Sequence, residues 1–115
     1  MTKNNCAKGD IWLIDFNPGR GSEQTGIRPA VIIQNDIGNK NAATTIVAII
    51  TTTLKKYPIT VLLDAGEGGL EKPCMINLSQ ILTIDKERLI KKLGSLNEEK
   101  ISQVNTSLKI SLDLS

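Results

Sequence analysis

The chain has 115 residues, a formal net charge of +2, 40% apolar residues and 23% charged residues. This length and this mixture predict one globular domain over residues 1–115, with a core that needs no metal or disulfide to stabilise it. The sequence contains no histidine, which excludes Ser-His and Cys-His nucleophiles and the usual zinc sites.

Six short strands are predicted along most of the chain, because β-branched and aromatic residues cluster between turn-forming ones. They cover residues 10–16, 29–34, 44–51, 59–63, 74–78 and 80–84. Residues 35–42 and 54–58 are expected to be loops, and residues 64–69 a flexible turn. A short helical turn is expected to start at residues 85–88 and to end at Gly94.

The last segment is predicted to be a helix that packs on the sheet. Its apolar residues recur at spacings of three and four and form one stripe, made of Ile101, Val104, Leu108 and Leu112. Asn97 is a suitable N-cap, and a capping box of Ser95 with Glu98 is the alternative. Closely spaced strands and one substantial helix favour a mainly β (α+β) fold. We expect a small SH3-like, partly closed antiparallel barrel of about five to seven strands with the C-terminal helix packed on it.

The loop at residues 19–28 and the strand after it are the most informative stretch. Its glycines allow a close approach to a ligand, and Pro29 disfavours helix at Arg28. Arg28 is therefore expected to have an extended backbone where the loop becomes the strand. Its guanidinium and the polar loop beside it could bind a phosphate or a carboxylate. Turn geometry and a solvated arginine would explain the same residues. A P-loop is excluded because the Gly-Lys-Ser/Thr ending is missing and a strand follows.

Thr51, Thr52 and Thr53 end the third predicted strand. Strand propensity alone explains a threonine triplet, but the end of this strand can lie beside the strand that Arg28 opens. A hydroxyl and a guanidinium that flank one phosphate would suit phosphoryl transfer. The pair Lys55-Lys56 is a candidate phosphate contact, although a solvated basic turn is the simpler interpretation.

The segment GDIWLIDFNPGRGSEQTGIRPAVIIQND at residues 9–36, with VAIITT at residues 47–52, resembles the MazF/PemK family of toxin endoribonucleases. The resemblance runs from Gly9 to the terminal helix. It implies the toxin component of a type II toxin–antitoxin system, a sequence-specific, ribosome-independent endoribonuclease that cleaves single-stranded mRNA without a metal or other cofactor. The 2′-hydroxyl would attack the adjacent phosphorus and leave a 2′,3′-cyclic phosphate and a 5′-hydroxyl end, which inhibits translation and growth.

The resemblance also implies the site residues. Arg28 and Thr51 match the arginine and threonine that the family uses for cleavage, and Glu23-Gln24 match its functional Glu-Gln pair. Because arginine stays protonated, Arg28 is expected to stabilise the transition state and act as an acid while Thr51 orients the phosphate. The base for the 2′-hydroxyl proton stays open, with Glu23 as one candidate. RNA contacts are expected from the loops at residues 17–25 and 52–58 and from Gln80, with the supporting residues Ser22, Glu23, Gln24, Thr52, Thr53 and Gln80.

The implied partners are single-stranded RNA, a second copy of the chain and a cognate antitoxin. Members of this family are homodimers with an RNA groove along the subunit interface, and the antitoxin lays a disordered acidic segment into that groove. A slightly basic groove would attract an acidic peptide and RNA alike, so inhibition by competition is expected.

Two other functions are compatible with the residues. A non-catalytic barrel toxin, similar to CcdB, would bind a protein target such as DNA gyrase. A metal-dependent nuclease would use Asp10, Asp15 and Asp36, which lie on or beside the first two strands.

Cysteine use and hydropathy indicate the compartment. Cys6 and Cys74 have no metal-ligand spacing, and Cys6 is expected in a frayed N-terminus, so a reduced cytoplasmic protein is favoured. No apolar run approaches a membrane span, and the polar start does not resemble a signal peptide.

Overall fold

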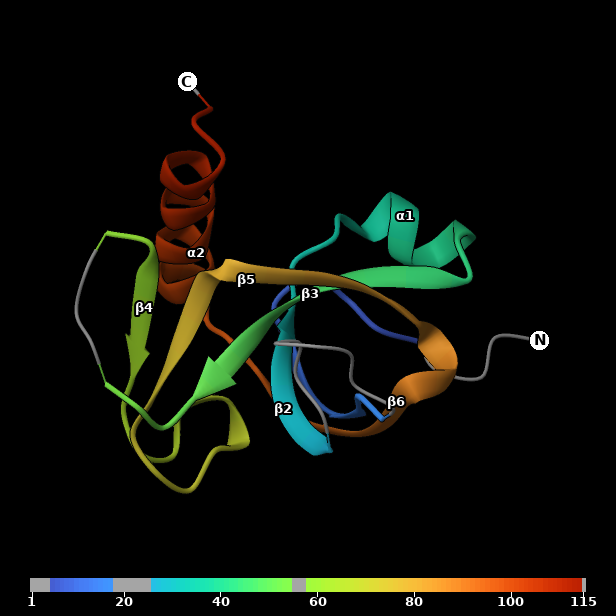
Figure 1. Ribbon diagram of the computed structural model, residues 1–115, viewed down its shortest axis with the longest axis horizontal. Helices are drawn as coiled ribbons and strands as arrows, with labels where there is room; N and C mark the ends of the chain where they lie inside the picture. Colours follow the sequence, from blue (N-terminus) through green and yellow to red (C-terminus); the bar gives the residue numbers. More distant parts are fainter. Residues whose placement is uncertain (1–4, 18–25, 55–57, 115) are drawn as a thin grey trace.

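The computed structural model describes residues 5–17, 26–54 and 58–114, which form one antiparallel sheet and a C-terminal helix (Figure 1). The strands are β1 (Asp10–Asp15), β2 (Ile27–Ile32), β3 (Thr44–Thr51), β4 (Thr60–Leu63), β5 (Cys74–Asp85) and β6 (Leu89–Ser95). The helices are α1 (Asp36–Asn41) and α2 (Glu98–Ser111), with 3-10 turns η1 (Glu67–Gly69) and η2 (Lys86–Arg88). The strand order is β4-β5-β3-β2-β1-β6. The predicted mainly β fold with a terminal helix is confirmed.

Both faces of the sheet are buried, which explains the unbroken apolar runs in β2 and β3. Successive side chains of a strand point to opposite faces. Val31 and Ala48 accordingly belong to one apolar cluster, which α2 joins through Val104. Ala30 and Val47 belong to a second cluster on the other face. Strands covered on both faces lose the apolar–polar alternation of a half-exposed sheet.

The fifth and sixth predicted strands are one long strand, β5. Its pairing with β3 changes register between Ala48 and Ile49, where the partner jumps from Ile81 to Asn77. Such a bulge bends the strand, so β5 pairs with β3 along both halves of its length and with β4 along the first half. The predicted break at residue 79 lies inside this bulge.

Two elements correct the sequence-based expectations. Residues 85–94 are not one helical turn, because only Lys86–Arg88 are helical and β6 follows. The strand β6 pairs with β1 and lies at the edge of the sheet. Its lysines obscure the strand pattern in the sequence, but charged side chains are common on edge strands. The expected loop at residues 35–42 contains α1, which Asn35 caps by accepting a hydrogen bond from the Gly38 N–H.

A buried polar residue explains why weak helix formers adopt α1. Asn39 is only 3% exposed. Its side chain donates to the carbonyl of Gln34 at 2.9 Å and accepts from the Thr45 hydroxyl at 2.7 Å. These partners lie outside the helix, so tertiary contacts outweigh the low intrinsic propensity of the segment.

The turn η1 packs its backbone directly on β6. A Cβ atom at Gly69 would lie 1.9 Å from the carbonyl oxygen of Leu93, and one at Gly94 would lie 2.4 Å from that of Gly68. Only glycines allow this approach. The segment after β4 is thereby held against the opposite edge strand, which partly closes the sheet into a barrel.

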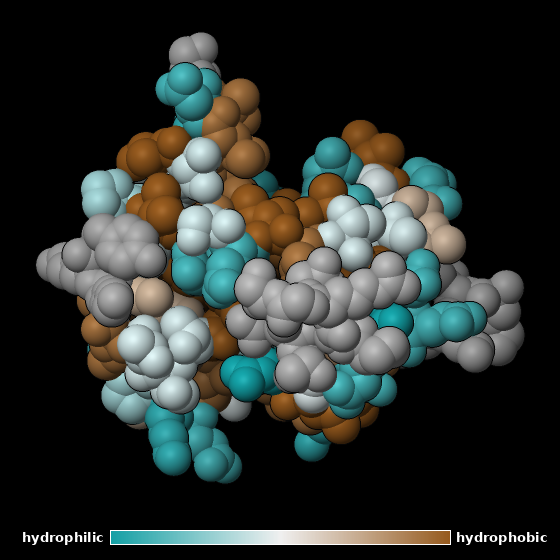
Figure 2. All heavy atoms as spheres, in the orientation of Figure 1, coloured by the Kyte–Doolittle hydropathy of each residue, from teal (hydrophilic) through white to brown (hydrophobic). Residues whose placement is uncertain are grey.

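Helix α2 packs on β4 and β5, as the apolar stripe predicts. Asn97 is the N-cap, and its side chain accepts from the Lys100 N–H at 2.9 Å. Leu112 lies past the last helical residue and is 54% exposed, so it is not part of the packed stripe. Figure 2 shows a hollow with hydrophobic residues between α2 and α1 in this view. No helix in the described ranges is long and apolar enough to cross a membrane.

Cys6 is buried in the second cluster with Trp12 and Phe16, not in a frayed terminus. Burial raises the pKa of the Cys6 thiol, against a smaller opposing effect of its hydrogen bond with Thr45. The two aromatic rings are 7% and 6% exposed, so neither can serve as a stacking surface for a nucleic-acid base.

Candidate active site

Arg28 and Thr51 come from neighbouring strands, β2 and β3, and lie at the same end of the sheet. The recorded pairs between these two strands end with Ala30 and Ile49, so Arg28 and Thr51 each lie two residues beyond the last pair. Because side chains alternate along a strand, both lie on the face that carries Ala30 and Ile49, whereas Pro29 and Ile50 face the other way.

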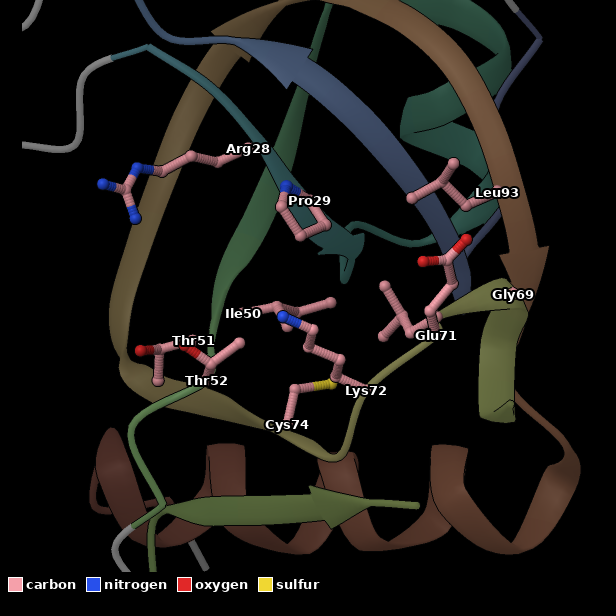
Figure 3. A pocket seen from close by; sticks show the side chains of 11 residues that line it. Arg28, Pro29, Ile50, Thr51, Thr52, Gly69, Glu71, Lys72, Cys74 and Leu93 are labelled. Atoms are coloured by element: carbon pink, nitrogen blue, oxygen red, sulfur yellow. The ribbon is translucent and has the colours of Figure 1, made fainter. Parts of the chain in front are cut away.

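The two residues also border the same cavity, of about 410 Å³. Pro29, which follows Arg28, and Ile50, which precedes Thr51, form part of the apolar wall of the cavity. A cavity of this size falls in the range of about 300–1,000 Å³ typical of small-molecule sites. Figure 3 shows the guanidinium of Arg28 directed away from the centre of the cavity, on the side where Thr51 and Thr52 lie. A phosphate held there would have its attached nucleotide beside the cavity.

The opposite wall of the cavity was missed by sequence reasoning. It is formed by the segment between η1 and β5 and by one residue of β6, namely Gly69, Leu70, Glu71, Lys72, Cys74 and Leu93. These residues are 41 to 65 positions from Arg28 in the sequence, and nothing in their local pattern indicates a site. The Gly-Gly pair at residues 68–69 is the one usable signal, since paired glycines allow close backbone contact.

The cavity carries charge at its rim and a neutral thiol in its wall. Figure 3 shows the ammonium of Lys72 directed inward near Ile50 and the carboxylate of Glu71 on the side of Leu93. Cys74 is 2% exposed. Burial, with a smaller contribution from the charge of Glu67, raises the pKa of the Cys74 thiol. Cys74 is therefore an apolar wall residue at neutral pH and a poor nucleophile.

The other predicted site residues divide into three groups. Thr52 borders the cavity, whereas Thr53 only donates its backbone N–H to the Thr51 hydroxyl at 3.1 Å, a turn contact at the end of β3. Gln80 is exposed in the β5 bulge, where its side chain accepts from Asn77 at 3.5 Å, and it does not border the cavity. Outside the described residues lie Ser22, Glu23, Gln24, Lys55 and Lys56.

The three aspartates of the metal-nuclease hypothesis have separate structural contacts. Asp10 accepts from the Ala7 N–H at 2.9 Å and forms an ion pair with Lys92 at 3.4 Å. Asp15 accepts from the backbone of Asn17 at 2.9 Å. Within residues 5–17, 26–54 and 58–114, no three His, Cys, Asp or Glu side chains gather in a way that could hold a metal ion.

Asp36 anchors the N-terminal segment to α1. Its carboxylate accepts from the Lys8 N–H at 2.8 Å, and this bond, with a second from the Asn39 side chain, lowers the pKa of Asp36 from its ordinary value. A carboxylate bound in this way contributes to stability above its ordinary pKa and loses that contribution as the pH falls through the lowered value.

The sequence of residues 7–112 matches the family described as PemK-like, MazF-like toxin of type II toxin-antitoxin system. The chain belongs to this toxin family. Among similar proteins in it, endoribonuclease MazF of Staphylococcus saprophyticus is 48% identical over 109 residues, which are 93% of this chain and 91% of the relative. Endoribonuclease EndoA of Bacillus subtilis is 46% identical over 109 residues, covering 93% of this chain and 94% of that protein.

Solved structures of this toxin family share the fold. A mycobacterial endoribonuclease in complex with its cognate antitoxin superposes with a TM-score of 0.81 at 24% identity, over 96% of this chain and 97% of that one. MazF from Deinococcus radiodurans also has a TM-score of 0.81, at 22% identity, over 96% of this chain and 99% of that one. The same barrel therefore persists where most side chains have changed.

Proposed function

We propose that this chain is the toxin of a type II toxin–antitoxin pair and cleaves single-stranded mRNA internally, at a site built on Arg28 and Thr51. The observation that carries the proposal is that Arg28 and Thr51 border one cavity at the same end of two neighbouring strands, in a chain whose curated relatives are named endoribonucleases. A similar solved structure contains a cognate antitoxin, so an antitoxin is the proposed inhibitor. We further propose a homodimer that acts in the cytoplasm.

The proposed reaction is an internal transesterification. The 2′-oxygen forms a bond to phosphorus, the bond from phosphorus to the 5′-oxygen breaks, and the products are a 2′,3′-cyclic phosphate and a 5′-hydroxyl. A base takes the proton of the 2′-hydroxyl, with Glu23 as one candidate, and the departing 5′-oxygen gains a proton from Arg28. Arg28 stabilises the charge that develops on the phosphorane oxygens and donates to the departing oxygen, while the Thr51 hydroxyl orients the phosphate. Arginine is a poor base because it stays protonated.

The competing hypothesis of a gyrase-directed binder is less favoured. The relatives of this chain are named endoribonucleases, and a binder has no need for a guanidinium and a hydroxyl at one cavity.

A cleavage assay on a defined RNA with and without EDTA separates the hypotheses. We expect cutting in both conditions, because the proposed mechanism uses only side chains. Loss of cutting in EDTA would favour the metal nuclease, and no cutting in either would favour a binder.

A second substrate tests the nucleophile. An RNA with one 2′-deoxy sugar at the scissile position should bind and resist cleavage, and its cleavage would instead indicate attack by water.

A further inference from the structure

The cavity has a second cationic residue, Lys72, opposite the strand that carries Arg28. Its ammonium points into the cavity toward the side of Arg28 and Thr51, while the Glu71 carboxylate lies on the far side beside Leu93 (Figure 3). Within residues 5–17, 26–54 and 58–114, no hydrogen bond or ion pair is recorded for the Lys72 side chain. Several other lysines have structural partners: Lys8 with Asn105, Lys86 with Asn39, Lys92 with Asp10, and Lys100 with Glu67.

The segment that carries Lys72 is held at both ends. On one side, the Leu70 N–H donates to the carbonyl of Glu67 at 3.1 Å, and η1 lies against β6 through the glycine contact. On the other side, Cys74 is already in β5 and pairs with Leu63. A side chain on so short and anchored a segment loses little additional backbone freedom when it binds a ligand.

The rest of the cavity suits a nucleotide base. Its walls include the aliphatic side chains of Pro29, Ile50, Leu70 and Leu93. Proteins read single-stranded RNA by turning bases out of the stack into such pockets and binding their edges. Trp12 and Phe16 are buried, so a base in this cavity would contact aliphatic side chains.

We infer that Lys72 binds a second RNA phosphate, adjacent to the one held by Arg28 and Thr51, and that the base between the two phosphates enters the cavity. The inference rests on the proposed endoribonuclease function and adds a binding residue to it. The two cations attract the RNA backbone, and Glu71 repels it from the far side. The Glu71 carboxylate then faces the base edge, where it can accept from an N–H group.

A salt titration of binding tests this assignment, with RNA made uncleavable by a 2′-deoxy sugar at the scissile position. The binding constant falls as salt rises, and each phosphate contact to a single strand adds about 0.7 to the steepness of log K against log salt. Lys72→Gln should therefore make this slope shallower by about 0.7. On cleavable RNA it should raise KM about tenfold with kcat nearly unchanged, because a charge-assisted contact is lost from substrate and transition state alike.

Two further variants serve as controls. Lys72→Arg keeps the cation and should restore the slope and KM. Lys40→Gln makes the same charge change at an exposed residue of α1 that does not border the cavity, and it should change neither.

The outcomes separate the two proposals. An unchanged slope and KM for Lys72→Gln, in a protein that cleaves RNA, would overturn the assignment of Lys72 alone. If Lys40→Gln changed the slope and KM as much as Lys72→Gln, the effect would be one of overall charge, and the assignment of Lys72 would be overturned too. If the wild-type chain cleaves no RNA, the proposed function fails first.

Discussion

At the scale of single residues, the proposed chemistry depends on two side chains with different properties. Arg28 is exposed at the start of β2 and carries a permanent charge that matches a phosphate in geometry. Thr51 is half-buried at the end of β3 and its hydroxyl already accepts a bond from the Thr53 N–H. The hydroxyl oxygen is therefore held in place before RNA arrives, which suits a positioning role.

Arg28→Ala should reduce kcat by about 10²–10³, the usual cost of one lost donor to developing negative charge. Because Arg28 is exposed, the midpoint of thermal unfolding should change little. Arg28→Lys keeps the charge and loses the planar fork, so its rate should lie between those of wild type and Arg28→Ala. Near-normal cleavage of a short RNA by Arg28→Ala would rule out the proposed role.

At the scale of elements, the decisive contact is between η1 and β6. The backbone of Gly68 and Gly69 touches that of Leu93 and Gly94 so closely that a Cβ atom cannot fit. This contact fixes the wall that bears Lys72 on the side of the cavity that faces β2 and β3. A small displacement of η1 would move that wall without touching Arg28 or Thr51.

Gly94→Ala tests this contact. The new Cβ would meet the Gly68 carbonyl oxygen at 2.4 Å, so the backbone must shift. We expect a loss of about 1–3 kcal/mol in the free energy of unfolding and a higher KM for RNA, measured by denaturant titration and initial rates.

Gly66→Ala is the matched control for that variant. Gly66 has a φ of +92° but open space around its Cβ position, so alanine there should cost about 1–2 kcal/mol through backbone strain alone and leave KM unchanged. An unchanged KM in Gly94→Ala would show that the contact with η1 does not position the cavity wall.

At the scale of the whole molecule, one sheet separates two apolar clusters and carries the proposed site at one end of its central strands. Large apolar side chains remain on the surface, including Ile37, Leu54, Ile110 and Leu112, each more than half exposed. Exposed apolar side chains are normal when scattered and indicate contacts when they are grouped. The proposed homodimer would cover part of this surface.

Light scattering at micromolar concentration should therefore give twice the mass of one chain. The family resemblance implies an RNA groove along the subunit interface, so cleavage should fall on dilution to concentrations where the dimer dissociates. A stable monomer that still cleaves RNA would contradict an interfacial groove.

Much of the fold follows from local sequence patterns. The β-branched runs predict β3 and most of β1 and β2, and Asn97 with the stripe of Ile101, Val104 and Leu108 predicts α2. Elements that depend on contacts with other elements are not predicted by these patterns. The strand β6 is stable because it pairs with β1, and α1 because Asn39 bonds to Thr45. The partner of β6 is far away in the sequence, and the bond between Asn39 and Thr45 depends on where β3 lies relative to α1, so propensity within either segment could not show these contacts.

The sequence by itself determined β3, most of β1 and β2, and the N-cap at Asn97, because these depend on local propensity. Its resemblance to the toxin family also singled out Arg28 and Thr51 as the proposed site. Only the tertiary structure decided that Thr51 borders the same cavity as Arg28 and that Glu71, Lys72 and Leu93 form its far wall. The physical reason is that strand register and the close approach of η1 to β6 are set by packing between segments far apart in the chain.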